Sequence, residues 1–123
     1  MQKRIEINKF RKLDNRLELE GINPALDTGT LRATGEMLVD SDSLAFIYKL
    51  ENEQEFIYVS LPSEIWPFLK EVIETEQQVN LILDDTNIEL TNIIPEIKYL
   101  LHNIEGNANY GDDMVHKVEE IFL

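Results

Sequence analysis

Residues 44–50, with the sequence LAFIYKL, and residues 55–61, with the sequence EFIYVSL, decide the fold of this chain. Apolar side chains occupy both odd and even positions of each stretch, whereas a strand exposed on one face alternates apolar with polar residues. Continuous apolar runs of this length are typical of strands that are covered on both faces. The two stretches, joined by the polar residues 51–54, therefore predict a central hairpin. We expect helices on one of its faces, and either a curled N-terminal sheet or a second subunit on the other.

Shorter strands are expected before this hairpin. Residues 4–8 and 16–20 alternate apolar with polar side chains, which is the period of a half-buried strand. Asp14-Asn15 between them favours a tight turn, since both residue types tolerate the left-handed conformation. Residues 21–35 carry no sustained period and are expected to form a loop, followed by a short strand at residues 36–40.

The hydrophobic period changes after residue 62. Apolar residues recur with helical spacing in three later segments, which predicts amphipathic helices. The first begins after Ser63 as its N-cap, the second lies between Asn92 and Gly106, and the third begins at Asp112. A further hairpin, residues 79–90, separates the first two helices.

Together these elements predict an α+β fold. We expect a single domain over residues 1–123, with a mainly antiparallel sheet of six to seven strands, one helix between strand pairs and two C-terminal helices. The length suits one core, because a domain of this size buries roughly two-thirds of the surface of its unfolded chain.

The composition excludes several classes of function. The 123 residues include 24 acidic and 11 basic side chains, a formal net charge of −13, and no cysteine. Such a surface repels phosphates, which argues against nucleic-acid and anionic-membrane binding. The lack of cysteine excludes a disulfide, a thiolate zinc site and a thiol nucleophile. The N-terminus lacks the apolar segment of a signal peptide and no run reaches membrane-spanning length, so we expect a cytoplasmic protein.

The charge is distributed unevenly. Residues 1–32 hold seven of the eleven basic side chains, whereas the remaining residues carry 4 basic and 19 acidic groups. We interpret the basic segment as an edge that lies against the chain's own acidic body and is partly neutralised there, since acids interrupt each basic cluster. One alternative is a basic arm that binds DNA or RNA. Another is an acidic body that mimics nucleic acid in the groove of a basic partner.

The sequence contains no local motif of catalysis or cofactor binding, and we expect no cofactor. His102 and His116 fall outside the apolar faces of their helices and are interpreted as solvent-exposed. Asp40 and Asp42 open a twelve-residue window that imitates a calcium loop, but Ala45 stands where that loop needs glycine. We therefore predict no metal site, with a weak cation site at Asp40 and Asp42 as the alternative.

The candidate binding surface is aromatic and polar. Trp66 and Tyr99 lie off the centres of the apolar stripes of their predicted helices, and semi-exposed aromatic residues are enriched in protein interfaces. Asn107, Asn109 and Tyr110 lie on the short loop between the last two predicted helices, where two amides and a phenol can recognise a peptide or a polar small molecule. The alternative is that this loop is only a helix connector, in which asparagine and glycine are ordinary residues.

Three segments carry a resemblance to a known family: GEMLVDSD at residues 35–42, AFIY at residues 45–48 and LLHNIEGNANYG at residues 100–111. They are similar to a family of small acidic cytosolic proteins from Bacillus-type Firmicutes. The similarity runs from about residue 3 to residue 122, and its most specific strings are MLVDSD and GNANYG. The family is uncharacterised, so the resemblance implies a bacterial, cytoplasmic, single-domain protein and assigns no catalytic residue. The loop at residues 21–34 is longer than the loop expected at this place in the family.

The sequence favours a non-enzymatic protein-interaction or regulatory module. Its partner is expected to be another protein or a second copy of the chain in a homodimer, and neither a nucleic acid nor a membrane. The alternative is a small carboxylate-based enzyme or a binder of a metal or small ligand, since paired carboxylates can do acid–base work where burial separates their pKa values.

Overall fold

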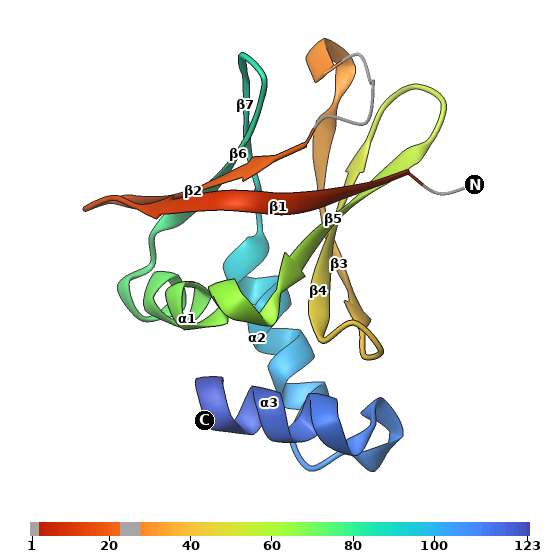
Figure 1. Cartoon of the computed structure of the whole chain (residues 1–123), viewed down its shortest axis with the longest axis vertical. Helices are drawn as coiled ribbons and strands as arrows, with labels where there is room; N and C mark the ends of the chain where they lie inside the picture. The colour runs from red at the N-terminus through yellow and green to blue at the C-terminus, as the bar shows by residue number, and fades with distance from the viewer. Residues whose placement is uncertain (1–2, 23–27) are drawn as a thin grey trace.

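The computed structural model of the chain describes residues 3–22 and 28–123. Within these residues, seven strands form one sheet in the order β3-β4-β5-β1-β2-β6-β7, which curls so that its two halves lie at an angle to one another (Figure 1). The strands are β1 (Lys3–Lys12), β2 (Arg16–Gly21), β3 (Arg32–Asp40), β4 (Ala45–Glu51), β5 (Phe56–Pro62), β6 (Gln78–Leu83) and β7 (Thr86–Glu89). The helices are α1 (Trp66–Thr75), α2 (Ile93–Ile104) and α3 (Asp112–Phe122), with short 3-10 turns at Thr28–Thr30, Ser63–Ile65 and Ala108–Tyr110.

Strand β1 belongs to both halves of the sheet. Residues 3–6 pair in parallel with β5, whereas residues 7–12 pair antiparallel with β2, and the register shifts between Ile7 and Lys9. Such a shift marks a bulge, which bends the strand. Because β2 pairs in parallel with β6, the β1–β2 hairpin lies between β5 and β6. The predicted α+β class and number of strands are confirmed, and the sheet is mixed, with four antiparallel and two parallel pairings.

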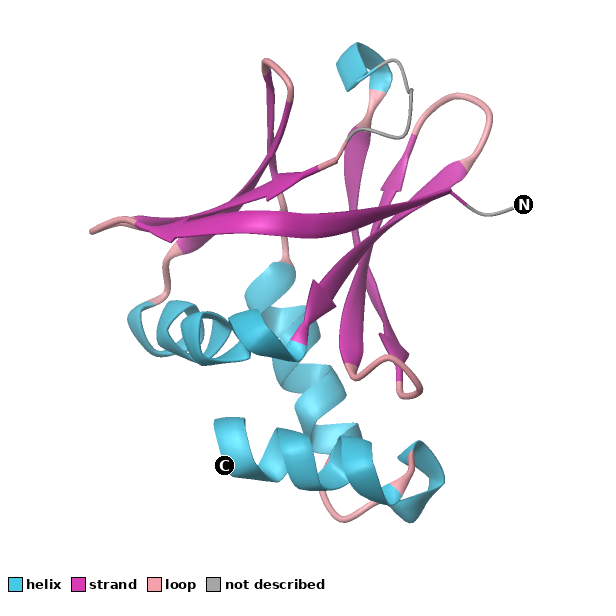
Figure 2. Cartoon of the chain, viewed as in Figure 1, coloured by secondary structure: helices cyan, strands magenta, loops and turns pink. Residues whose placement is uncertain are grey.

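The concave side of the sheet holds the hydrophobic core. Figure 2 shows all three helices gathered on one side of the curled sheet. Buried residues from every strand and every α-helix form one continuous cluster. Three aromatic rings meet in it: the ring centroid of Trp66 lies 4.9 Å from that of Phe46 and 5.7 Å from that of Phe122. This contact joins the central strand β4 to α1 and to the last turn of α3.

The predicted central hairpin is confirmed. Strands β4 and β5 pair antiparallel, from Ala45 opposite Pro62 to Glu51 opposite Phe56. The inner face of this hairpin contributes to the same core cluster as the N-terminal hairpin and the helices. The curled N-terminal sheet and the helices therefore cover the same face of the hairpin. They do not account for the apolar residues on its other face.

The expected loop at residues 21–35 is partly wrong. Strand β3 begins at Arg32, within the expected loop, while residues 23–27 lie outside the described residues. Gly35 has a φ of +77°, and the pairing of β3 with β4 shifts register around it. A bulge of this kind interrupts regular pairing: Ala33 and Met37, four positions apart, lie opposite Leu50 and Tyr48, which are two positions apart. The alternation of apolar and polar residues therefore predicts only the second part of the strand, residues 36–40.

The helices follow the predicted pattern, with one change at the first. Ser63 lies inside a 3-10 turn rather than at an N-cap, and α1 begins at Trp66 with Pro67 in its first turn. Helices α2 and α3 begin at Ile93 and Asp112, as predicted. A proline at the start of α1 is tolerated because the first turn has no intrahelical acceptor for its missing N–H group.

No helix within residues 3–22 and 28–123 is long and apolar enough to span a lipid bilayer.

Candidate functional site

Trp66 is a core residue, so its predicted exposure is wrong. Its side chain is fully buried, and its Nε1 donates a hydrogen bond to the carbonyl oxygen of Leu61 at 3.0 Å. The predicted apolar stripe counts Ile65 as helical, whereas Ile65 ends a 3-10 turn. This turn changes the direction in which the next side chain points, and Trp66 faces the core from the first position of α1.

The loop between α2 and α3 uses part of its predicted binding set for its own structure. The side chain of Asn107 accepts a hydrogen bond from the backbone N–H of Asn109 at 3.1 Å, and its Nδ2 donates to the carbonyl oxygen of Asn103 at 3.1 Å. Tyr110 is partly buried against the core, and Asn109 is exposed. These contacts support the helix-connector interpretation, and recognition of a ligand by this loop stays a prediction.

Tyr99 is exposed over 63% of its surface on α2. His102 and His116 are also exposed, as predicted. Because Trp66 lies in the core, the five predicted binding residues do not form one continuous surface.

Asp40 is held by an arginine. Arg4 Nη2 lies 2.9 Å from Asp40 Oδ2, and the backbone N–H of Ser43 donates to Asp40 Oδ1 at 3.2 Å. Partial burial opposes the ionisation of Asp40, but these hydrogen bonds outweigh it and hold the pKa of the carboxyl below its usual value. Asp42 is exposed in the adjoining turn, and the described residues contain no cluster of three or more metal-ligating side chains. Asp40 is therefore the carboxylate of an ion pair, which makes it a poor general acid.

The outer face of β3, β4, β5 and β1 is a second apolar surface. Residues that lie opposite one another in a ladder share a face of the sheet. The observed register therefore puts Leu38, Ile47 and Ser60 in one row, with Tyr58 and Lys49 in the next. We define the outer face by these rows and their neighbours on the same side of the sheet: Arg4, Glu6, Arg32, Glu36, Leu38, Asp40, Ala45, Ile47, Lys49, Glu51, Phe56, Tyr58 and Ser60.

The outer face has no cover among the described helices and strands. The three helices lie on the opposite, concave side of the sheet (Figure 2). Leu38 and Phe56 are 46% and 44% exposed. Ala45 and Ile47 are buried, yet they do not belong to the hydrophobic core cluster. Their neighbours on the outer face shield them instead, so the hairpin carries a thin second apolar layer.

Arg4 crosses the outer face and carries most of its polar contacts. Its Nη2 donates to Ser60 Oγ at 3.0 Å, and the same nitrogen lies 2.9 Å from Asp40 Oδ2. Its Nε lies 3.2 Å from Glu6 Oε1. A guanidinium group engaged on three sides holds its aliphatic stem flat on the sheet, which is how a charged residue shields apolar neighbours.

The outer face has a depression and a projection. The depression has a volume of about 220 Å³ and is lined by Arg4, Leu38, Val39, Asp40, Ile47 and Tyr58. The projection is Phe56, at the start of β5. Lys49 Nζ lies 4.2 Å from the centroid of the Phe56 ring and 3.6 Å from Glu36 Oε2. The ammonium group thus stacks on the aromatic ring while it is paired with a carboxylate.

The other half of the sheet presents a polar outer surface. Glu18 is nearly buried between two arginines, 2.8 Å from Arg11 and 2.9 Å from Arg16. Hydrogen bonds from Arg11 and then Arg16 hold the pKa of the Glu18 carboxyl below its usual value. On the neighbouring strands, Asn80 Nδ2 donates to Asn87 Oδ1 at 2.9 Å. Arg11 and Arg16 are thus paired with an acid of their own basic segment, whereas Arg4 and Arg32 are paired with Asp40 and Glu51 of the acidic body.

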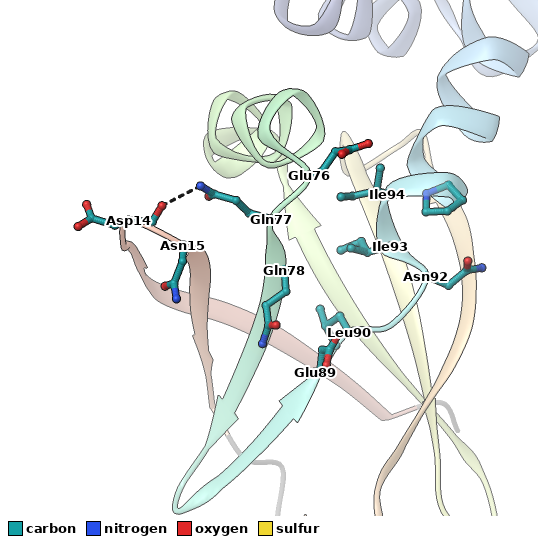
Figure 3. A pocket seen from close by; sticks show the side chains of 11 residues that line it. Asp14, Asn15, Glu76, Gln77, Gln78, Glu89, Leu90, Asn92, Ile93 and Ile94 are labelled. Atoms are coloured by element: carbon teal, nitrogen blue, oxygen red, sulfur yellow. Dashed lines mark hydrogen bonds between the residues drawn. The ribbon is translucent and has the colours of Figure 1, made fainter.

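An open cleft of about 480 Å³ lies where the β1–β2 turn, the α1–β6 connection and the start of α2 meet (Figure 3). Its lining comprises Asp14, Asn15, Glu76, Gln77, Gln78, Glu89, Leu90, Asn92, Ile93, Ile94 and Pro95. These described residues include three carboxylates and no lysine, arginine or histidine. In Figure 3 the side chains of Ile93 and Ile94 point towards β6, whereas the carboxylate of Asp14 points away from the cleft.

Gln77 connects the two sides of this cleft. Its Nε2 donates to the carbonyl oxygen of Asp14 at 2.8 Å, and its buried Oε1 finds no hydrogen-bond partner among the described residues. A buried acceptor without a donor costs roughly 1–3 kcal/mol. Because this oxygen is buried, it offers no exposed acceptor to a ligand in the open cleft.

Sequence reasoning missed the outer face. Apolar residues at both odd and even positions of residues 44–50 and 55–61 do indicate a second covered face, but they do not show which side chains stay exposed. The pair of Arg4 and Asp40 joins segments that are distant in the sequence and leaves no local pattern. Leu38 lies two positions before Asp40 in a strand whose first part the alternation does not reveal.

Comparisons with known proteins place the chain in a family. Residues 5–122 match a family described as "Family of unknown function (UPF0738)". The UPF0738 protein GWCH70_0774 of Geobacillus sp. (strain WCH70) is 44% identical over all of this chain and 99% of its own length. The UPF0738 proteins Bcer98_0913 of Bacillus cytotoxicus and BCG9842_B4089 of Bacillus cereus (strain G9842) are 39% and 41% identical over the full length of both chains. No solved structure matches the chain. The chain belongs to the UPF0738 family of bacterial proteins of unknown function.

Proposed function

We propose that this protein is a cytoplasmic, non-enzymatic protein-binding module whose contact surface is the outer face. One observation carries the proposal: Leu38 and Phe56 remain 46% and 44% exposed on a face that no described helix or strand covers. Full burial of a leucine or phenylalanine side chain is worth about 1.5–3 kcal/mol, so each of these two has roughly 1 kcal/mol still to gain from a partner.

The composition of the outer face suits a protein partner. Phe56, Tyr58 and Arg4 are of the residue types that are enriched at protein interfaces. The arginine already has its hydrogen bonds within the face, to Ser60, Asp40 and Glu6. A partner that covers it therefore does not leave a buried charge without compensation, which is the main penalty when charged groups enter an interface. The occupant that fits is an apolar protein surface of low charge.

The ion pair of Arg4 and Asp40 supports binding over catalysis at this face. Its two hydrogen-bond donors keep Asp40 ionised and positioned, with a pKa below the usual value. A general acid needs the opposite shift, a carboxyl whose pKa is raised towards neutrality.

The test is capture of a partner by surface variants. Wild-type protein, Leu38→Glu and Leu123→Glu are tagged and used to retain proteins from bacterial cytosol, with mass spectrometry as readout. Leu123 is the matched control, because it is also an exposed leucine but follows α3, away from the outer face. A partner retained by wild type and Leu123→Glu but lost by Leu38→Glu is the expected result. Equal retention by all three proteins would contradict the proposal.

The open cleft supports a second candidate function, the binding of a small amine-bearing molecule. Glu76 and Glu89 line the cleft together with no basic residue, which favours a ligand that donates hydrogen bonds and carries positive charge. The test is thermal unfolding with a diamine, with a polyamine and with equal ionic strength of sodium chloride. Native-state binding raises the melting temperature, so a rise specific to the amines and lost in Glu89→Gln supports this candidate.

A further inference from the structure

We infer that the outer face binds a second copy of this chain, forming a two-fold symmetric dimer through β3, β4, β5 and β1. This inference rests on the proposed function, because it names the partner for the same surface. The argument uses the charge, the shape and the extent of the outer face.

The charge of the outer face differs from that of the whole chain. The chain carries a formal net charge of −13. The outer face carries three cations and four carboxylates, a net of −1, and the cations are ion-paired within the face: Arg4 with Asp40 and Glu6, Lys49 with Glu36, and Arg32 with Glu51. Two acidic copies repel one another through most of their surfaces, so the nearly neutral face is where they can approach.

The charge also decides against other occupants. A strongly basic protein is attracted more strongly to other parts of this acidic chain, because the carboxylates of the outer face are already paired with the cations of that face. A strongly acidic protein or a nucleic acid is repelled by the chain as a whole. An apolar surface of low net charge remains, and the outer face is itself such a surface.

The shape of the outer face is suited to self-association. Phe56 is 44% exposed at the start of β5, and the 220 Å³ depression begins beside it, lined by Tyr58, the next outward-facing residue of that strand, and by Ile47 and Leu38. A cavity of about 150 Å³ is enough to hold a benzene molecule, so the depression has room for a phenyl ring. A two-fold axis between the projection and the depression puts Phe56 of each copy over the depression of the other. This reciprocity is the property of an isologous interface, in which one patch serves both subunits.

The extent of the face sets the strength of the contact. Four adjacent strands, seven residues long in β4 and β5, cover about 19 Å by 23 Å at ordinary strand spacings. A standard stable interface buries about 800 Å² on each partner, which is more than this face offers. The dimer is therefore expected to dissociate reversibly on dilution.

The test is sedimentation equilibrium of the full chain from about 5 μM to about 500 μM, where a reversible dimer is detected by mass action. Wild-type protein and Leu123→Glu, a change at an exposed leucine away from the outer face, are expected to rise from 14.3 kDa towards twice that mass. Leu38→Glu and Phe56→Ser are expected to stay monomeric while their circular dichroism and urea midpoints remain those of a folded protein. Both changes lie at exposed positions, so the fold is retained.

Salt provides an independent readout. Raising the salt from about 50 mM to about 500 mM screens the repulsion between two acidic copies, so the dimer is expected to tighten several-fold. A contact made by ion pairs between subunits weakens instead, and that result would overturn the interface described here.

The outcomes separate this inference from the proposed function. A wild-type chain that stays monomeric, together with capture of a different protein that Leu38→Glu abolishes, overturns the second-copy inference and leaves the binding module standing. A monomeric chain whose captured proteins are unaffected by Leu38→Glu overturns both. A dimer that persists in both Leu38→Glu and Phe56→Ser places the interface elsewhere and also overturns the inference.

Discussion

The hydroxyl of Tyr48 donates a hydrogen bond to the carbonyl oxygen of Thr91 at 2.5 Å. The same hydroxyl accepts a hydrogen bond from the backbone N–H of Gly35 at 3.2 Å, and Asn92 Nδ2 donates to the carbonyl oxygen of Gly35 at 3.1 Å. Tyr48 lies on β4, Gly35 on the edge strand β3, and Thr91 between the opposite edge strand β7 and α2. One phenol therefore ties together the two ends of a sheet whose edge strands do not pair.

Tyr48→Phe is expected to lower the free energy of unfolding by about 1–2 kcal/mol, because the change leaves the Thr91 carbonyl and the Gly35 N–H without this partner. Urea denaturation at neutral pH measures the effect, with Tyr99→Phe at an exposed position as control. Burial raises the pKa of Tyr48, so its phenol should also ionise above the ordinary tyrosine range in an ultraviolet titration. Equal urea midpoints for the two variants would show that the phenol does not hold the sheet ends together.

Trp66→Ala is expected to destabilise the protein by about 3–5 kcal/mol, the usual cost of removing a large aromatic side chain from a core. The loss includes the packing against Phe46 and Phe122 and the hydrogen bond to Leu61. Tyr99→Ala should stay within about 0.5 kcal/mol of wild type, since its side chain is exposed. Thermal and urea unfolding of both variants compares them, and a tolerated Trp66→Ala would contradict the burial of this residue.

Glu18→Gln is expected to destabilise the protein at pH 7 and to become equivalent to wild type in acid. The pKa of Glu18 is lower in the folded chain than in an unfolded one, because Arg11 and Arg16 bond to the carboxylate. A group of this kind stabilises the fold at pH values above its unfolded pKa of about 4.3, and the contribution is lost as the pH falls through the folded pKa. Urea midpoints measured from neutral pH into acid should therefore converge. A constant difference at every pH would mean that the carboxylate charge plays no part.

Gly21→Ala is expected to cost about 1–3 kcal/mol, the range for overpacking a core. A Cβ atom at residue 21 would lie 2.4 Å from Cγ2 of Ile5, whose side chain is fully buried. Removing that methyl group by Ile5→Ala relieves the clash, so the double variant should be more stable than the sum of the two single effects. Additive effects in this double-mutant cycle would exclude the close approach as the cause.

The sequence predicts those parts of the fold that are encoded by neighbouring residues. The β4–β5 hairpin, the hairpin at residues 79–90 and the start of α3 at Asp112 all have local patterns, and all three are found. Pairing partners separated by some fifty residues have no local pattern. The parallel pairings of β1 with β5 and of β2 with β6 are therefore absent from the prediction. The four strands that take part in these pairings are each predicted.

The candidate site shows the same difference between features encoded by neighbouring residues and features that depend on distant ones. Exposure of Tyr99 follows from its position on a regular helix, and the structure agrees. Burial of Trp66 depends on a 3-10 turn that shifts the start of α1 and on contact with Phe122 at the far end of the chain. The outer face depends on the register of four strands and on the ion pair of Arg4 and Asp40 across it. Tertiary contacts of this kind override local periodicity, so the surface emerges only from the assembled sheet.

The position of the β1–β2 hairpin between β5 and β6 has a consequence for the protein while it is being synthesised. The hairpin leaves the ribosome before its two flanking strands, which end only at Pro62 and Leu83. Until those residues emerge, both edges of the nascent hairpin are unpaired, and open strand edges recruit other chains. Charged side chains on a strand edge discourage such pairing. The charged residues of β1 and β2 are of the kind that discourages pairing of an open edge with another chain.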